Sequence, residues 1–355
     1  MKKDNLIGFA DLSVERRKIK SQFFNQINII VNWRPISNLI NKHYSRGVSA
    51  VGTPAYPGLL LFKMSLLQTW YGLSDYEVED RLNDSISFSR FVGLSLDDKS
   101  PDHSVLSRFR SELTQKGIYE KLFRELNKQL EMHKVIIKTG ALIDASVTDT
   151  LRKPKGKAKY EIAEDRAEEE RPTEEIKKEE IKQELIKKTQ PGVDTEARWL
   201  KKAGKLHYGY KKHCVTDNEG MVLGILTTEA NINEIVNLED VLNTCELPEG
   251  TPVYMDKGYS SAKNREILRK RKLKDRIMHK ATKKNKLGYW ENLFNKGISK
   301  TRYKVERTFG GMKRWFGAGI ARYVGMAKTH TQHLMEAMAY NLYRSPGIIM
   351  SSREK

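Results

Sequence analysis

The sequence has few of the features that mark secreted, zinc-binding or membrane proteins. Its 355 residues include only two cysteines, Cys214 and Cys245, and neither lies in a CxxC or Cys/His cluster. A disulfide framework and a zinc site are therefore not expected. No apolar run reaches the roughly 18 residues that span a bilayer, and the N-terminal stretch "MKKDNLIGFADLSVERRKIK" lacks the apolar core of a secretory signal. We expect a cytoplasmic protein without a membrane partner.

Acidic residues are fewer than basic residues. There are 45 Asp and Glu against 64 Lys and Arg, which gives a formal net charge of +19. So large an excess favours a polyanionic partner, and with no membrane signal that partner is expected to be nucleic acid. A basic cytosolic protein without such a partner is the alternative that charge alone leaves open. The length predicts two or three domains.

The first 134 residues read as helical. "PAYPGLLLFKMSLLQTWYGLS" is an apolar run that opens at Pro57 and closes near Gly72, as a buried helix would. Further on, "DDKSPDHSVLSRFRSEL" predicts a turn and a short helix carrying Arg108 and Arg110. Short helices joined by a turn suit a helix-turn-helix-like DNA reader, although ordinary helix packing gives the same spacing. We predict a helical DNA-binding domain over 1–134.

The pattern changes at residue 135. Five segments read as strands, and helical segments separate the later ones: "VIIKTGALIDAS", "LHYGYKKHCVTD", "MVLGILTTEAN", "TPVYMDKGYS" and "DRIMHKA". This order predicts an α/β fold, a mixed five-stranded sheet flanked by helices. We place this domain at 135–345, with a C-terminal tail at 346–355.

A charged insertion interrupts the second domain at about 153–198. Between Lys153 and Gln190 there are eleven acidic and eleven basic residues, so the whole net charge lies elsewhere. The segment has too little apolar content to build a core. After Pro172, Glu and Lys recur at helical spacing, which predicts a solvated helix; a coiled coil for a partner is the alternative.

Two aspartates end predicted strands. "LID" stops at Asp144 and "VYMD" at Asp256. A buried carboxylate needs a cation or a metal beside it, and two such residues meet if their strands are neighbours. Either one alone could simply cap the following turn.

The stretch "TRYKVERTFGGMKRWFG" predicts a basic helix with one acid, Glu306. At about 100° per residue, Arg302, Glu306 and Lys313 fall together, beside a buried apolar stripe. One interpretation is a helix salt-bridge ladder. The other is that Glu306 converges with the two aspartates, and that a hard cation, Mg²⁺ or Mn²⁺, relieves their repulsion.

The order Asp144, Asp256, Glu306, with R-x3-E-x6-K around the glutamate, resembles a DDE transposase. The closer resemblance is to family five of the bacterial insertion-sequence transposases, within the wider family-four and family-five group. "LIDAS", "GKLHYGYKKHCVTD", "TTEANINE" and "YMDKGY" look like its catalytic core. The sequence departs from the family where Ser299 stands in place of a tyrosine.

The resemblance implies a ribonuclease-H-like core in which the first and fourth strands are neighbours. It implies that Asp144, Asp256 and Glu306 hold two Mg²⁺ ions, with Mn²⁺ as a substitute. The implied activity is hydrolysis at the terminal inverted repeats of an element, followed by joining of the 3′-hydroxyl to target DNA. Double-stranded DNA and a homodimer or larger assembly are the implied partners, at the bacterial nucleoid.

Several residues are expected to contact DNA, since they are basic or aromatic and lie near these motifs: Arg302, Lys313, Lys257, Tyr259, Arg307, Arg314, Arg108, Arg110 and Trp199. Two other functions stay open. The chain could be a ribonuclease-H-like nuclease that does not join strands, or an inactive DNA-binding protein derived from a transposase.

Overall fold

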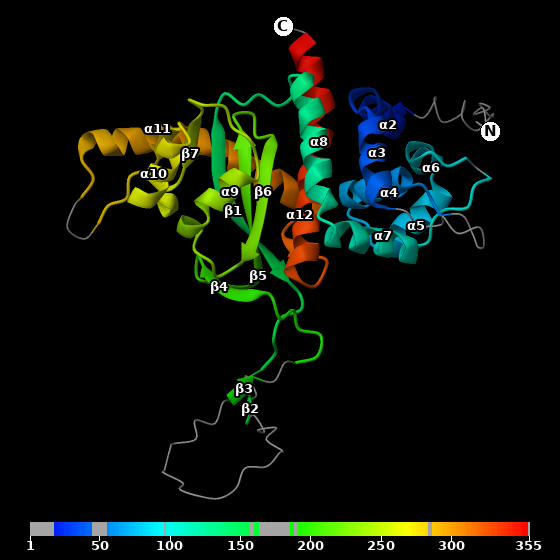
Figure 1. The fold of residues 1–355 in the computed structure, drawn as a ribbon, viewed down its shortest axis with the longest axis horizontal. Helices are drawn as coiled ribbons and strands as arrows, with labels where there is room; N and C mark the ends of the chain where they lie inside the picture. Colours follow the sequence, from blue (N-terminus) through cyan, green and yellow to red (C-terminus); the bar gives the residue numbers. More distant parts are fainter. Residues whose placement is uncertain are drawn as a thin grey trace, which may run out of the picture.

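The computed structural model describes residues 18–44, 55–95, 97–156, 160–162, 185–187, 190–282 and 286–353. Figure 1 shows two parts, a group of helices from the first third of the chain and a twisted sheet with helices around it. Helices α8 (Ile118–Met132) and α12 (Met326–Arg353) run between them.

The N-terminal part is helical, as predicted. Helix α4 (Gly58–Tyr71) starts directly after Pro57 and stops at Gly72, whose φ of 67° only a residue without a side chain adopts easily. Both ends were predicted from the sequence. Around α4 lie the other helices of this part: α2 (Lys18–Ile30), α3 (Trp33–His43), α5 (Asp75–Asp84), α6 (Ile86–Val92) and α7 (His103–Gln115).

The sheet contains the five predicted strands. They are β1 (Ala141–Thr150), β5 (Lys205–Asp217), β6 (Val222–Glu229), β7 (Pro252–Met255) and β8 (Lys274–Ile277). Strand β5 pairs antiparallel with β6 and β1, whereas β1, β7 and β8 run parallel. The first and fourth of these strands, β1 and β7, are neighbours, as the resemblance implied. Two short strands, β4 (Arg198–Lys202) and β9 (Ile320–Ala321), bring the sheet to seven within the described residues.

Helices and short turns complete the sheet domain. They are η1 (Glu234–Val236), α9 (Leu238–Asn243), η2 (Lys257–Tyr259), α10 (Ala262–Lys270) and α11 (Tyr289–Phe316). The long helix α11 packs on β1 and β7. This contact brings the predicted R-x3-E-x6-K segment against the two strands that carry the aspartates.

Helix α12 joins the two parts. It contacts β6 on one side and α8, α4 and α2 on the other, and 331–342 is buried throughout. A continuous apolar cluster includes Leu61 of α4, Ile143 of β1 and Met338 of α12. The helix continues through Pro346 to Arg353, so the tail boundary drawn at 346 falls inside a helix. In the part of the chain that the structure covers, no helix is both long and apolar enough for a bilayer.

The ends of the charged insertion are tied together. The Lys155 amide donates to Gln190 Oε1 at 3.0 Å, and Gln190 Nε2 donates back to the Lys155 carbonyl at 2.7 Å. A separate two-stranded ladder, β2 (Tyr160–Ile162) with β3 (Leu185–Lys187), lies away from the main sheet. Within the segment after Pro172 that was predicted as a helix, Leu185–Lys187 form β3 instead, and the rest lies outside the described residues.

This closure supports a first prediction. A short Gly/Ser linker in place of residues 157–188 should leave the sheet intact, because the two flanking residues already hydrogen-bond to each other. We expect DNA cleavage by the folded deletion variant to stay near that of the full chain. Complete loss of cleavage, with an unchanged circular dichroism spectrum, would show instead that the insertion holds DNA or a partner.

Candidate catalytic site

Asp144 and Asp256 lie side by side on neighbouring strands. In the parallel register Ile143 pairs with Met255, and the two aspartates are the residues that follow this pair along the chain. Asp256 directly follows β7, as predicted. Asp144 does not end its strand: β1 continues for six residues beyond it, to Thr150. The prediction of a strand end was wrong there because β5 continues to pair with β1 as far as Asp149.

The Asp256 carboxylate is fixed by its own turn. It accepts a hydrogen bond of 2.7 Å from the Gly258 amide and so caps η2. Asp256 therefore caps the following turn, which was the alternative considered above, and it also lies beside Asp144. Capping holds one carboxylate oxygen in place and leaves the other free to accept a further ligand.

Gly258 gives a second prediction. A Cβ at this position would lie 2.7 Å from Asp256 Oδ1, closer than side chains approach. Gly258→Ala should push the carboxylate away and lower the rate of cleavage by about tenfold to a hundredfold, with the fold retained. Gly297→Ala is the matched control, since a Cβ there meets no atom within 4 Å. Equal cleavage rates for the two variants would contradict the placement of Asp256.

Arg302 of α11 forms an ion pair with Asp144. Its Nη2 lies 2.8 Å from Asp144 Oδ2, and both side chains are largely buried. Burial raises the pKa of Asp144 and the neighbouring charge of Asp256 raises it further, whereas Arg302 and the Ala145 amide lower it. The net direction is upward. Arg302 therefore holds the Asp144 carboxylate. The sequence had suggested Arg302 only as a phosphate contact, and that contact stays a prediction.

Glu306 lies one turn after Arg302 on α11, and it is exposed. No group of three His, Cys, Asp or Glu side chains within the described ranges is arranged to hold a metal ion. The structure thus brings Asp144, Asp256 and Arg302 together, while convergence of Glu306 with them stays a prediction.

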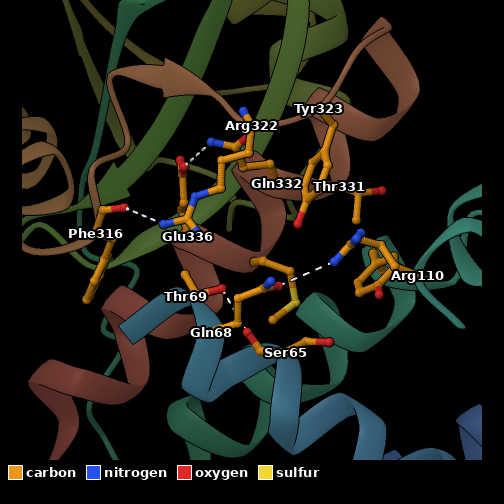
Figure 2. Close-up of a pocket in the computed structure, with 12 residues that line it drawn as sticks. Ser65, Gln68, Thr69, Arg110, Phe316, Arg322, Tyr323, Thr331, Gln332 and Glu336 are labelled. Carbon is orange, nitrogen blue, oxygen red and sulfur yellow. Dashed lines mark hydrogen bonds between the residues drawn. The ribbon is translucent and has the colours of Figure 1, made fainter. Parts of the chain in front are cut away.

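Arg110 is not on the surface. Only 6% of it is exposed, and its guanidinium pairs with Asp75 at 2.6 Å and stacks over the Tyr323 ring. Figure 2 shows it reaching Gln68 of α4 across a small cavity beside α12. The predicted DNA contact is wrong for Arg110. Its neighbour Arg108 is exposed, so the prediction stands for that residue.

Tyr259 is also in the interior. It is fully buried, and its hydroxyl has no hydrogen-bond partner among the residues that the structure describes. Burial raises the pKa of Tyr259 well above its ordinary value, and the charges of Glu234, Asp144 and Asp256 add to the shift. The predicted DNA contact is therefore wrong for Tyr259. Glu234, on η1, is a residue near the site that the sequence reasoning missed, although it lies within "TTEANINE".

The other predicted DNA contacts are accessible. Four basic residues are exposed, and their contacts with DNA stay predictions: Lys257, Arg307, Lys313 and Arg314. Although Lys313 is exposed as a whole, partial desolvation lowers the pKa of its amino group, and the nearby charges of Lys212 and Lys202 lower it further. Trp199 on β4 is 45% exposed, and its ring centroid lies 4.9 Å from that of Tyr208. Tyr208 thus lies against the exposed indole ring, and the predicted contact of Trp199 with DNA stays a prediction.

A mixed sheet with two aspartates on adjacent parallel strands defines this domain as a ribonuclease-H-like catalytic domain. Comparison with known proteins agrees. Residues 12–112 match a family described as "Transposase domain (DUF772)", and residues 181–342 match "Transposase DDE domain". Asp256 and Glu306 lie inside the second match, and Asp144 lies before it.

A relative is named "Transposase for insertion sequence element IS1106", from Neisseria meningitidis serogroup B. It is 35% identical over 240 residues, which cover 67% of this chain and 76% of the relative. The chain belongs to the DDE transposases of insertion sequences. It is therefore a DNA transposase, an enzyme, as the resemblance implied.

Proposed function

We propose that this transposase binds the terminal inverted repeats of its element, hydrolyses the phosphodiester at the element end and joins the freed 3′-hydroxyl to target DNA. The observation that carries this mechanism is the pair Asp144 and Asp256 on adjacent strands, with Arg302 beside it. We also propose that the chain belongs to family five of the bacterial insertion-sequence transposases. Both reactions are in-line displacements at phosphorus, which depend on positioning and charge stabilisation.

The site fits a divalent cation. The carboxylates of Asp144 and Asp256 follow a paired position of two neighbouring strands, and the buried Tyr259 hydroxyl lacks a hydrogen-bond partner among the described residues. Oxygen ligands of this kind suit Mg²⁺, or Mn²⁺ in its place. Asp144, Asp256 and Glu306 would hold two such ions. When bound, the ions activate the attacking oxygen and stabilise the charge on the leaving oxygen.

The remaining residues would bind and orient DNA. Arg302 holds the Asp144 carboxylate through a buried ion pair and thereby fixes its direction. Lys257, next to Asp256, and three residues of α11, Arg307, Lys313 and Arg314, offer exposed cations to phosphates. Arg108 would contact DNA from the exposed face of α7, in a DNA-binding and dimerisation domain over 1–134. We place the protein in the cytoplasm, on the nucleoid, acting as a homodimer or larger assembly.

A joining assay tests this proposal against a nuclease that cuts without strand transfer. The substrate is a duplex end with its 3′-hydroxyl already freed, together with a supercoiled target plasmid. The proposal predicts covalent joining of the labelled end to the plasmid in Mg²⁺, and no joining when the 3′-hydroxyl is replaced by hydrogen. Cleavage of uncut ends without any joining of pre-cut ends would favour the nuclease.

A further inference from the structure

Glu234 lies on a turn that is clamped to the turn carrying Asp256. The Asn233 side chain accepts a hydrogen bond of 3.1 Å from the Ile235 amide and so begins η1. Turn η1 packs against η2, which Asp256 caps. The Asn264 amide, almost fully buried in α10, donates to the Ile235 carbonyl at 3.0 Å and to the Tyr259 carbonyl at 2.8 Å. One side chain therefore fixes both turns relative to each other.

The Glu234 carboxylate is held on this clamp by a buried lysine. Lys211 Nζ lies 3.5 Å from Glu234 Oε1 and donates to the Ile232 carbonyl at 2.7 Å. At 3.5 Å the ion pair is longer than a strong charged hydrogen bond. A carboxylate has about four acceptor positions, so this single long contact leaves Glu234 able to accept others.

The charges of Asp144 and Asp256 act on the Glu234 carboxylate. Burial raises the pKa of Glu234, Lys211 lowers it, and both Asp144 and Asp256 raise it. The Glu234 side chain is 20% exposed, so it is partly desolvated. Charges interact more strongly in such a region than in water. The fully buried Tyr259 lies in the field of all three carboxylates. Glu234 is thus a third acid near Asp144 and Asp256, placed by the η1 and η2 clamp.

We propose that Glu234 is a positioning residue of the catalytic site. Its negative charge strengthens the binding of a divalent cation at Asp144 and Asp256, and Lys211 limits that effect. The inference rests on the proposed function, because it assumes that the aspartate pair binds the cation. Glu234 acts through its charge and through the clamp, since it does not form a three-residue ligand group with the aspartates in the described structure.

Two substitutions should change cation binding in opposite directions. Glu234→Gln keeps the shape and removes the charge, so the dissociation constant for Mn²⁺ should rise about threefold to tenfold. Lys211→Gln removes the opposing charge and should lower that constant. A merely structural role for the pair would weaken binding in both variants. Glu239→Gln, an exposed acid on the neighbouring helix α9, is the matched control and should bind Mn²⁺ as the unchanged chain does.

The experiment is an electron paramagnetic resonance titration of the full chain with Mn²⁺ alone, with thermal melting of each variant as the folding control. Opposite shifts for the two variants support the inference. Unchanged binding in Glu234→Gln, or weaker binding in both variants, overturns it. If Glu234→Gln unfolds at a lower temperature than the unchanged chain, the Lys211→Gln variant alone tests the inference. A lower dissociation constant for Mn²⁺ in that variant then supports it, and a higher one overturns it. Equal Mn²⁺ binding by the unchanged chain and by Asp144→Asn would instead show that the proposed cation site is wrong.

Discussion

Replacing either aspartate of the pair by asparagine should lower end cleavage and strand joining by at least about a thousandfold. Each change keeps the size of the side chain but removes a charge that the cation requires. Since the two carboxylates act as a unit, the double variant should be no worse than either single variant. DNA binding should survive, because the basic surface is unchanged. The measurement is a single-turnover cleavage assay on labelled end DNA with Asp144→Asn and Asp256→Asn.

Asp97→Asn serves as the control for that assay. Asp97 is exposed and lies in the N-terminal helical part, far along the chain from both strands, so its substitution should leave cleavage unchanged. Retained activity in Asp256→Asn would contradict the assignment most directly, because this carboxylate lies inside the matched DDE family region. Additive losses in the double variant would show that the two aspartates act separately.

The second large effect concerns stability. Lys212 of β5 and Glu336 of α12 form an ion pair at 2.5 Å, with only 1% and 3% of their side chains exposed. Lys212→Met would leave the Glu336 carboxylate buried, with a hydrogen bond from Gln332 but no cation paired to it. Breaking a buried pair in this way costs about 3–5 kcal/mol of unfolding free energy. The double variant Lys212→Met/Glu336→Leu should recover most of that loss, since neither charge then remains buried.

Urea denaturation, followed by circular dichroism, measures this effect. Glu249→Gln is the control, because its ion pair with Lys272 at 2.9 Å is exposed and should contribute little. If Lys212→Met cost no more than Glu249→Gln, the contact between β5 and α12 would not depend on this pair. If the double variant were as unstable as the single one, the loss would come from packing rather than from an unpaired charge.

Most of the fold could be predicted because its signals are local. The ends of α4 depend on Pro57 and Gly72, which act within one turn of the helix. The five core strands were visible as short apolar runs bounded by turn residues. Strands β4 and β9 were missed, because β4 is largely exposed and charged and β9 has two residues. Their pairing depends on β5 and β1, which no local pattern reveals.

The site was less predictable, because its contacts join distant parts of the chain. Arg110 resembled a DNA contact until its partner Asp75, 35 residues away, placed it in the interior. Asp144 resembled a strand end, because polar residues follow it in the sequence. Strand β1 nevertheless continues past Asp144, since it stays paired with β5 as far as Asp149. Glu234 gave no signal of its own, since only the packing of η1 on η2 brings it near the aspartates.

We propose that this chain cuts and joins DNA with a site built from Asp144, Asp256 and Glu306. The most direct test is end cleavage by folded Glu306→Gln protein, measured on labelled end DNA in Mg²⁺. Glu306 is exposed on α11, so the change should cost little stability. We predict that end binding survives and that cleavage and joining both collapse. Near-normal cutting by Glu306→Gln would contradict this mechanism and leave Glu306 as a surface residue between Arg302 and Lys313.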